Sequence, residues 1–137
     1  MASSAAKALN PRIRCFAVEP ETADDTKQSF RKGERVAIGP PPTIADGLRV
    51  QSPGVLTFPI LQQTAEDVLT VSDDEIVDTM KFMLSRMKLL LEPSGAAAAA
   101  AVLHRKLPGN VKRVGVVLSG GNIDVEFLAA LLGQTDI

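Results

Sequence analysis

The chain has 137 residues, 45% of them hydrophobic and 23% charged, which is the composition of one globular domain with a sizeable core. Its 15 basic and 16 acidic residues nearly balance, and its five aromatic residues are all phenylalanine. A nucleic-acid binder with a basic face and a stacking platform is therefore excluded. The N-terminus does not have the pattern of a secretory signal, and the longest apolar run is too short to cross a bilayer. With a single cysteine, Cys15, and no zinc-binding pattern, we expect a soluble cytoplasmic protein.

The first half of the chain predicts short elements separated by proline and glycine. A helix over 4–9 ends at Asn10-Pro11, and a strand follows over 12–20. Next come a polar loop with a short helix that ends at Gly33, and a Pro/Gly-rich crossing segment without regular structure. A short helix and a strand then follow, over 56–64 and 67–72.

The second half begins with the clearest helix. Ser72 and Glu75 form an S-x-x-E capping box. An apolar stripe at helical spacing follows, with methionines that we expect to fill the core: Ile76, Met80, Met83, Met87 and Leu90. Pro93 opens a second, alanine-rich helix that ends at Pro108-Gly109. A buried strand over 111–119 and a last helix over 123–133 complete the chain.

The order of elements from residue 67 onward is strand, helix, helix, strand, loop, helix. A connection of this length joins parallel strands, so the order predicts an α/β three-layer sandwich with a mostly parallel sheet and helices on both faces. Ligands of such sheets bind outside the carboxyl ends of the strands. The predicted strand 111–119 ends there with Ser119-Gly120-Gly121-Asn122.

Four segments together resemble one enzyme family: "VEPETADD", "TIADGL", "LLLEPSGAAAAAAV" and "VVLSGGNID". In this order and spacing they are similar to the pyridoxal-phosphate-dependent threonine dehydratase and serine racemase family, the fold-type II enzymes related to the tryptophan synthase β subunit. The resemblance implies that residues 1–137 form a single C-terminal segment of the larger domain of that fold. It also implies that the N-terminal catalytic half, with the lysine that holds the cofactor, is absent, so that no catalytic residue lies in this chain.

The resemblance implies a set of residues that bind pyridoxal 5'-phosphate. Ser119 matches the serine beside the ring nitrogen of the cofactor, and Gly120 and Gly121 match glycines that let the backbone approach the ring. Gly47 matches a glycine near cofactor and substrate, and Glu92 matches a glutamate near the ring. From the residues alone, an ordinary strand-to-helix turn, a turn glycine and a charge at a helix end stay open as alternatives.

Two further sites follow from the resemblance. The positions of Glu19, Ala23 and Asp25 match a divalent-cation site, where two carboxylates, a backbone carbonyl and waters would hold Mg²⁺ or Ca²⁺. A solvated acidic loop is the alternative. Lys88 and Asn122 match residues at a nucleotide effector site between subunits in the racemase branch.

The implied activity is that of an ammonia-lyase that converts L-threonine or L-serine to a 2-oxo acid and ammonia. A serine or other amino-acid racemase on the same scaffold is the near alternative. The expected partners are the amino-acid substrate, the missing N-terminal half if the enzyme is split, and further copies in a homo-oligomer when complete; nucleic acid and membrane are not expected.

Because the lysine is expected to be missing, a non-catalytic truncated or split-enzyme module is a further reading, and an unrelated α/β nucleotide-binding domain is a third. A partial fold should also expose an apolar face and self-associate or be marginally stable.

Overall fold

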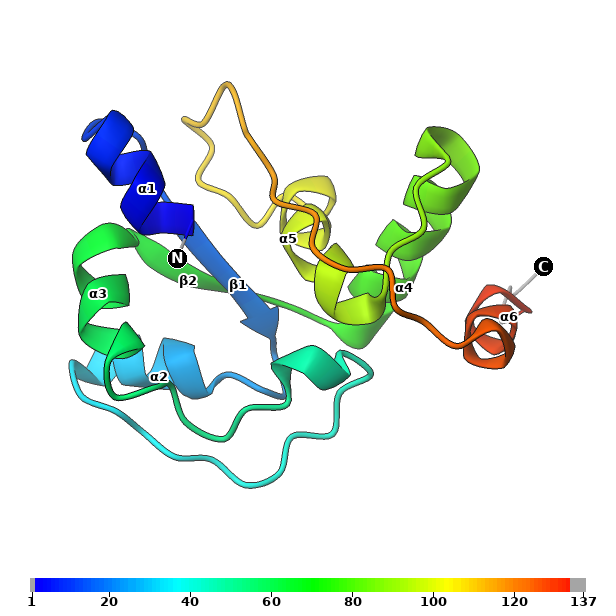
Figure 1. The fold of residues 1–137 in the computed structure, drawn as a ribbon, viewed down its shortest axis with the longest axis horizontal. Helices are drawn as coiled ribbons and strands as arrows, with labels where there is room; N and C mark the ends of the chain where they lie inside the picture. The colour runs from blue at the N-terminus through cyan, green and yellow to red at the C-terminus, as the bar shows by residue number, and fades with distance from the viewer. Residues whose placement is uncertain (1, 134–137) are drawn as a thin grey trace.

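The computed structural model describes residues 2–133 as an α/β fold in which helices surround a small parallel sheet (Figure 1). No described helix has the length and apolar character needed to cross a membrane. The elements follow in chain order: α1 (Ala2–Leu9), β1 (Phe16–Pro20), α2 (Asp25–Lys32), the 3-10 turn η1 (Asp46–Leu48), α3 (Thr57–Thr64), β2 (Asp67–Val71), α4 (Asp73–Phe82), the π-helical turn η2 (Met83–Met87), α5 (Pro93–Leu103) and α6 (Val125–Gly133).

The sheet of the described residues consists of β1 and β2, which pair in parallel with Val18 opposite Leu69. The ladder continues past both ends of the strands. The Glu66 amide donates to the Cys15 carbonyl, and the Glu21 amide donates to the Val71 carbonyl. The parallel sheet predicted from the length of the connections is therefore confirmed.

Helices cover both faces of this sheet, as predicted. On one face, β2 packs its Leu69 and Val71 side chains into a core that includes Ala97 and Ala100 of α5. On the other face, the buried Val68 adjoins Phe58 of α3 in a shared pocket. This alternation follows from the two-residue period of a strand, and burial on both faces explains why the consecutive residues Val68 and Leu69 are both apolar.

The start of α4 is confirmed in detail, but its end differs from the prediction. Ser72 Oγ accepts the Glu75 amide at 3.1 Å, and the Glu75 carboxylate accepts the Ser72 amide at 2.9 Å, which completes the capping box. The α-helix ends at Phe82 and loosens into η2, and Lys88 then adopts a φ of 59°.

This early end changes which methionines belong to the core. Met80 is buried, whereas Met87 is 56% exposed and Leu90 is 48% exposed. The wider π turn and the left-handed Lys88 break the 3.6-residue period, so the apolar stripe no longer faces the core beyond Met83.

The predicted strand over 111–119 is wrong: this segment is extended but belongs to no sheet in the described part of the chain. In Figure 1 it is the orange coil that passes in front of α5. A strand needs a neighbour that supplies hydrogen-bond partners, and no described backbone group pairs with residues 112–119. Its apolar side chains therefore stay accessible, with Val117 63% exposed and Val114 45% exposed.

Candidate functional site

The loop that follows the extended segment packs against the first turn of α5. A β-carbon on Gly95 would lie 1.9 Å from the Ser119 carbonyl oxygen and 2.7 Å from that of Gly120. Since real β-carbons do not approach an oxygen so closely, only glycine at position 95 lets the loop lie here. The Ser119 hydroxyl forms no hydrogen bond with any residue from 2 to 133, so it is free to bind a ligand.

Glu92, just before α5, lies against the same loop. Its amide donates to the Gly120 carbonyl at 3.3 Å. Gly120 has a φ of 84°, and a β-carbon there would come within 2.0 Å of Glu92 Oε1. Gly121 is constrained as well, because its β-carbon would lie 2.8 Å from the Leu90 carbonyl oxygen. Both glycines therefore permit close backbone approach.

A second loop reaches the start of α5 from the crossing segment. The Gly47 amide donates to Ser94 Oγ at 2.9 Å. Asp73, the first residue of α4, holds this loop in place: its carboxylate accepts the Thr43 hydroxyl and the Ile44 amide, the latter at 3.0 Å.

The five residues expected at the cofactor thus lie around the first turn of α5, although they come from three separate stretches of sequence. The structure adds three residues to this constellation that the sequence did not single out: Asp73, Ser94 and Gly95. A Ser-Gly pair directly after the N1 proline of an alanine-rich helix was the available signal for Ser94 and Gly95. For Asp73 there was none, because its partners lie about 30 residues away.

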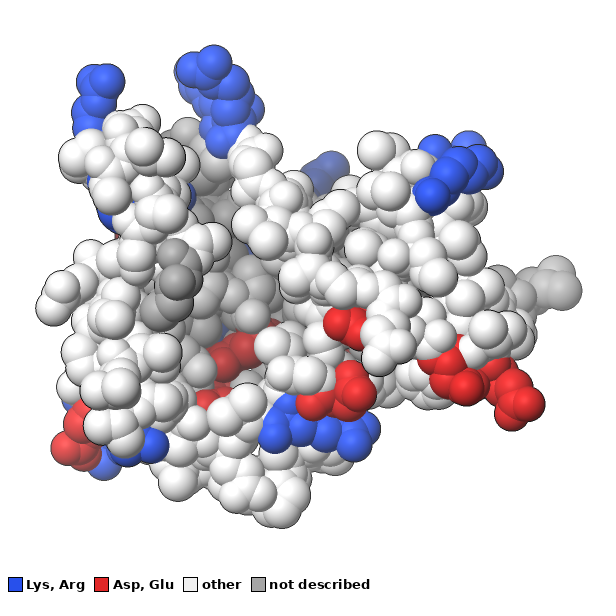
Figure 2. Space-filling view, in the orientation of Figure 1, with Lys and Arg blue, Asp and Glu red and all other residues white. Residues whose placement is uncertain are grey.

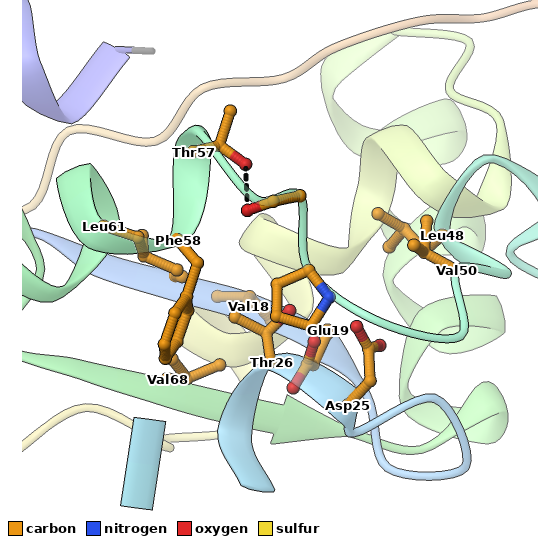
Figure 3. A pocket seen from close by; sticks show the side chains of 13 residues that line it. Val18, Glu19, Asp25, Thr26, Leu48, Val50, Thr57, Phe58, Leu61 and Val68 are labelled. Carbon is orange, nitrogen blue, oxygen red and sulfur yellow. Dashed lines mark hydrogen bonds between the residues drawn. The ribbon is translucent and has the colours of Figure 1, made fainter. Parts of the chain in front are cut away.

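The expected cation-binding residues also lie together, at the carboxyl end of β1. Glu19, Ala23 and Asp25 are all buried, with 7%, 0% and 2% of their surfaces exposed. Figure 3 shows the Glu19 and Asp25 carboxylates side by side at one wall of a pocket. Glu19 Oε1 accepts the Lys27 amide at 2.7 Å, whereas Asp25 Oδ2 is buried without a hydrogen-bond partner among the described residues.

Burial governs the acidity of this pair. Desolvation raises the pKa of Glu19 to about 7, despite hydrogen bonds from Lys27 and Thr26, and the neighbouring Asp25 charge raises it further. The pKa of Asp25 is raised by the same cause. Two carboxylates that resist ionisation together, one with an unsatisfied oxygen, form a site that a cation would stabilise. Within residues 2–133 no three His, Cys, Asp or Glu side chains gather into a metal-binding group, so any cation here would need the Ala23 carbonyl and water as well.

The pocket beside this pair has a volume of about 280 Å³ and is mainly apolar (Figure 3). It lies between the sheet face that carries Ala17 and Val68, helix α3 with Phe58 and Leu61, and the loop around Pro53. The apolar pocket wall keeps the two carboxylates from full solvation, and this desolvation raises the pKa of Glu19 and of Asp25.

Lys88 and Asn122 lie on neighbouring segments but do not interact. The Gly121 backbone approaches Leu90, whereas the Lys88 ammonium donates to the Ser85 carbonyl at 2.7 Å. Both residues are exposed, and no hydrogen bond joins them within the described residues.

Comparison with known proteins assigns the chain to a family. Residues 2–120 match the family model described as "Pyridoxal-phosphate dependent enzyme". The chain is 45% identical over 130 residues to serine racemase of Schizosaccharomyces pombe, covering 95% of this chain and 40% of that protein. It is 44% identical over 128 residues to L-threo-3-hydroxyaspartate ammonia-lyase of Pseudomonas sp, covering 93% and 40%.

Solved structures similar to this chain include serine racemases, as the sequence relatives do. Maize serine racemase matches with a TM-score of 0.87 and 40% identity, over 96% of this chain and 42% of that one. Serine racemase from Dictyostelium discoideum matches with a TM-score of 0.83 and 43% identity, over 90% and 40%. The resemblance stated from the four motifs and the predicted fold class are both confirmed. The chain spans about two fifths of the length of the relatives that it matches.

Proposed function

Because the chain belongs to the pyridoxal-phosphate-dependent enzyme family, we propose that it forms one side of the cofactor site of an ammonia-lyase for L-threonine or L-serine. The observation that carries the proposal is the convergence of Ser119, Gly120, Gly47 and Glu92 on the first turn of α5. An unrelated nucleotide-binding domain is ruled out by the family match.

The residues fit this cofactor. When bound, pyridoxal phosphate withdraws electrons from the substrate α-carbon, so that its proton is lost and the β-hydroxyl can leave. The unpaired Ser119 hydroxyl would meet the ring nitrogen. As a neutral group it would not hold that nitrogen protonated, in contrast to a carboxylate. Gly120 and Gly121 let the loop close on Glu92 and Leu90, which would put Glu92 beside the ring.

The whole reaction needs residues that we expect outside this chain. We propose that the lysine that holds the cofactor lies outside these 137 residues, and that these residues alone have no lyase activity. Support comes from the relatives, which are about two and a half times as long as the stretch they share with it. The second candidate function is that of one half of a split enzyme or of a non-catalytic module.

Serine racemase activity is the near alternative, because several of the relatives are serine racemases. Serine racemases from fission yeast, Dictyostelium discoideum and cattle are each 44–45% identical to this chain. Both reactions begin with loss of the α-proton, so the residues on this side of the site serve either one.

We further propose that Glu19, Asp25 and the Ala23 carbonyl hold Mg²⁺ or Ca²⁺. The support is the buried, unpartnered Asp25 oxygen next to a carboxyl whose pKa is raised to about 7. Such a cation would be structural or activating, because its ligands lie on β1, on α2 and in the turn between them rather than at α5.

Other parts of the function also remain proposals. Lys88 and Asn122 would contribute to a nucleotide effector site, which a nucleotide titration of the complete enzyme would test. We propose that the complete enzyme is a homo-oligomer and that it is cytoplasmic, where a free Cys15 would stay reduced.

Reconstitution tests the main proposal. The chain is mixed with the N-terminal part of the fission yeast serine racemase that precedes the matched region, and pyridoxal phosphate is added. We expect cofactor absorbance and formation of a 2-oxo acid from L-threonine or L-serine; chiral analysis of serine separates lyase from racemase. Ser119→Ala should weaken activity, with Ser85→Ala as a control. Stable borohydride labelling of one lysine in the chain alone, with dehydratase activity, would contradict the proposed incompleteness.

A further inference from the structure

The pocket beside Glu19 and Asp25 combines two kinds of surface that a metal ion would not use together. Its volume is about 280 Å³, just below the ~300–1,000 Å³ that is typical of pockets for drug-sized ligands. Figure 3 shows Phe58 and Val68 on one side of it, Leu48 on the other, and the two carboxylates at one wall. In Figure 2 acidic side chains lie at the floor of a hollow on this face. The pocket is therefore an apolar chamber with acid at a single wall.

The acidic wall has no positive charge opposite it. Among the described residues that line the pocket, none is basic. Asp25 is 2% exposed, and its Oδ2 atom has no hydrogen-bond partner in residues 2–133. The Lys27 backbone amide donates to Glu19 Oε1, but the Lys27 ammonium donates to Thr70 Oγ1 at 3.3 Å. A ligand that brings positive charge and N–H donors to this wall would be favoured, because a buried carboxylate without them is costly.

We propose that the pocket binds a small primary alkylammonium ion, with its ammonium group at Glu19 and Asp25 and its alkyl chain against Phe58. One ammonium group has three N–H donors, enough for the free Asp25 oxygen and for the Glu19 carboxylate together. The alkyl chain leaves water for the apolar walls, which favours binding independently of charge. Such a ligand matches both surfaces of the pocket.

Three other classes of ligand match the pocket less well. A divalent cation satisfies the carboxylates but leaves the apolar walls uncovered. A neutral alcohol of the same shape covers these walls but brings no charge to the acidic wall. An amino acid with the same side chain carries a carboxylate next to its ammonium group, and Glu19 and Asp25 would repel it.

The alkylammonium ion and the divalent cation proposed above would share Glu19 and Asp25, so each would exclude the other. The inference rests on the proposed function only for this competition. Recognition of the amine itself depends on the lining of the pocket and on the free Asp25 oxygen. Such an amine would lower the occupancy of the cation site and would oppose any activation by the cation.

Three matched ligands test the pocket on the 137-residue chain. The probe is 3-methylbutylamine, which is protonated at pH 8 because the pKa of a primary amine is near that of lysine, about 10.4. Leucine adds a carboxylate to this molecule, and 3-methylbutan-1-ol replaces its ammonium group by a hydroxyl. With a chelator present to remove divalent cations, we expect saturable binding of the amine that shifts the methyl NMR signals of Leu61 and Val68. The other two ligands should bind at least about tenfold more weakly.

A matched pair of variants assigns the binding to the buried carboxylate. Asp25→Asn keeps the size of the side chain and removes its charge, so the amine should lose about tenfold in affinity and its advantage over the alcohol. Asp24→Asn is the control, because Asp24 does not line the pocket and its carboxylate accepts the Gln28 side-chain amide instead. Circular dichroism checks that both variants are folded, and the three ligands on the parent chain decide the question if Asp25→Asn is not.

Added Mg²⁺ at constant ionic strength separates this inference from the proposed function. We expect Mg²⁺ to weaken binding of the amine. Amine binding that Mg²⁺ leaves unchanged would support the pocket and count against the proposed cation site alone. The inference is overturned if the amine binds no more tightly than leucine or the alcohol, or if it leaves the Leu61 and Val68 signals unshifted. Equal affinity of folded Asp25→Asn and the parent chain would also overturn it.

Discussion

Gly95 in the first turn of α5 lies directly under the carbonyl of Ser119, so close that a β-carbon would come within 1.9 Å of the oxygen. Because position 95 has no side chain, the Ser119-Gly120-Gly121 loop can pack directly against the backbone of the helix. The Gly120 carbonyl of the same loop accepts the Glu92 amide, and Ser94 accepts the Gly47 amide, so the packing of one glycine helps to fix the relative positions of the residues proposed to bind the cofactor.

The first prediction concerns this glycine. An exposed helical Gly→Ala change usually adds up to about 1 kcal/mol of stability. Gly95→Ala should do the opposite, lowering the melting temperature, because the loop must move away from the new methyl group. Thermal unfolding followed by circular dichroism measures it. Gly109→Ala, with open space around it, is the control. Equal stability of Gly95→Ala and the parent chain would show that the loop does not pack here.

The second prediction concerns pH. The pKa of Glu19 is raised by burial from 4.5 to about 7, so the folded state binds the proton more tightly than the unfolded state does. With a chelator present to remove divalent cations, the free energy of unfolding should therefore fall as pH rises from about 4.5 to 7. Glu19→Gln, which is always neutral, should be the more stable chain near pH 8, by roughly 1 to 3 kcal/mol.

Urea unfolding over this pH range measures the effect, with the exposed Glu21→Gln as control. Residual pH dependence should remain, because the pKa of Asp25 is raised too. Mg²⁺ or Ca²⁺ should stabilise the parent chain above about pH 7 and should not stabilise Glu19→Gln. A parent chain whose stability is flat from acid to neutral pH would contradict the assignment.

The third prediction tests the link between Asp73 and the Gly47 loop. Asp73→Asn replaces one accepting oxygen by a donor that faces either the Ile44 amide or the Thr43 hydroxyl, so about 1 to 3 kcal/mol should be lost. Hydrogen exchange over residues 43–49 should become faster, while the helical signal stays the same. Asp74→Asn, on the exposed side of α4, is the matched control. Unchanged exchange would mean that another contact holds the loop.

The fourth prediction concerns the start of α4. Ser72→Ala removes the oxygen that accepts the Glu75 amide and frees the Glu75 side chain from its reciprocal bond. We expect a loss of about 0.5 to 2 kcal/mol in the free energy of unfolding. Ser85→Ala, whose hydroxyl only approaches the Phe82 carbonyl at 3.4 Å, should lie within experimental error of the parent. A neutral Ser72→Ala would show that the cap contributes nothing to stability.

The sequence by itself determined the local elements and the family. The Ser72 capping box, the left-handed Gly33 that ends α2 and the apolar β2 were readable because each depends on residues a few positions apart. The four motifs identified the family for a similar reason, since they keep fixed residue types at fixed spacing.

Only the tertiary structure decided what depends on distant partners. An apolar run such as 111–119 becomes a strand when a neighbour supplies hydrogen bonds, and no described residue supplies them. The burial of Asp25, the support of the Gly47 loop by Asp73 and the contact of Gly95 with Ser119 likewise join segments far apart in the chain. These distances cannot be predicted from the spacing of residues in the sequence, because they are set by how the helices pack on the sheet.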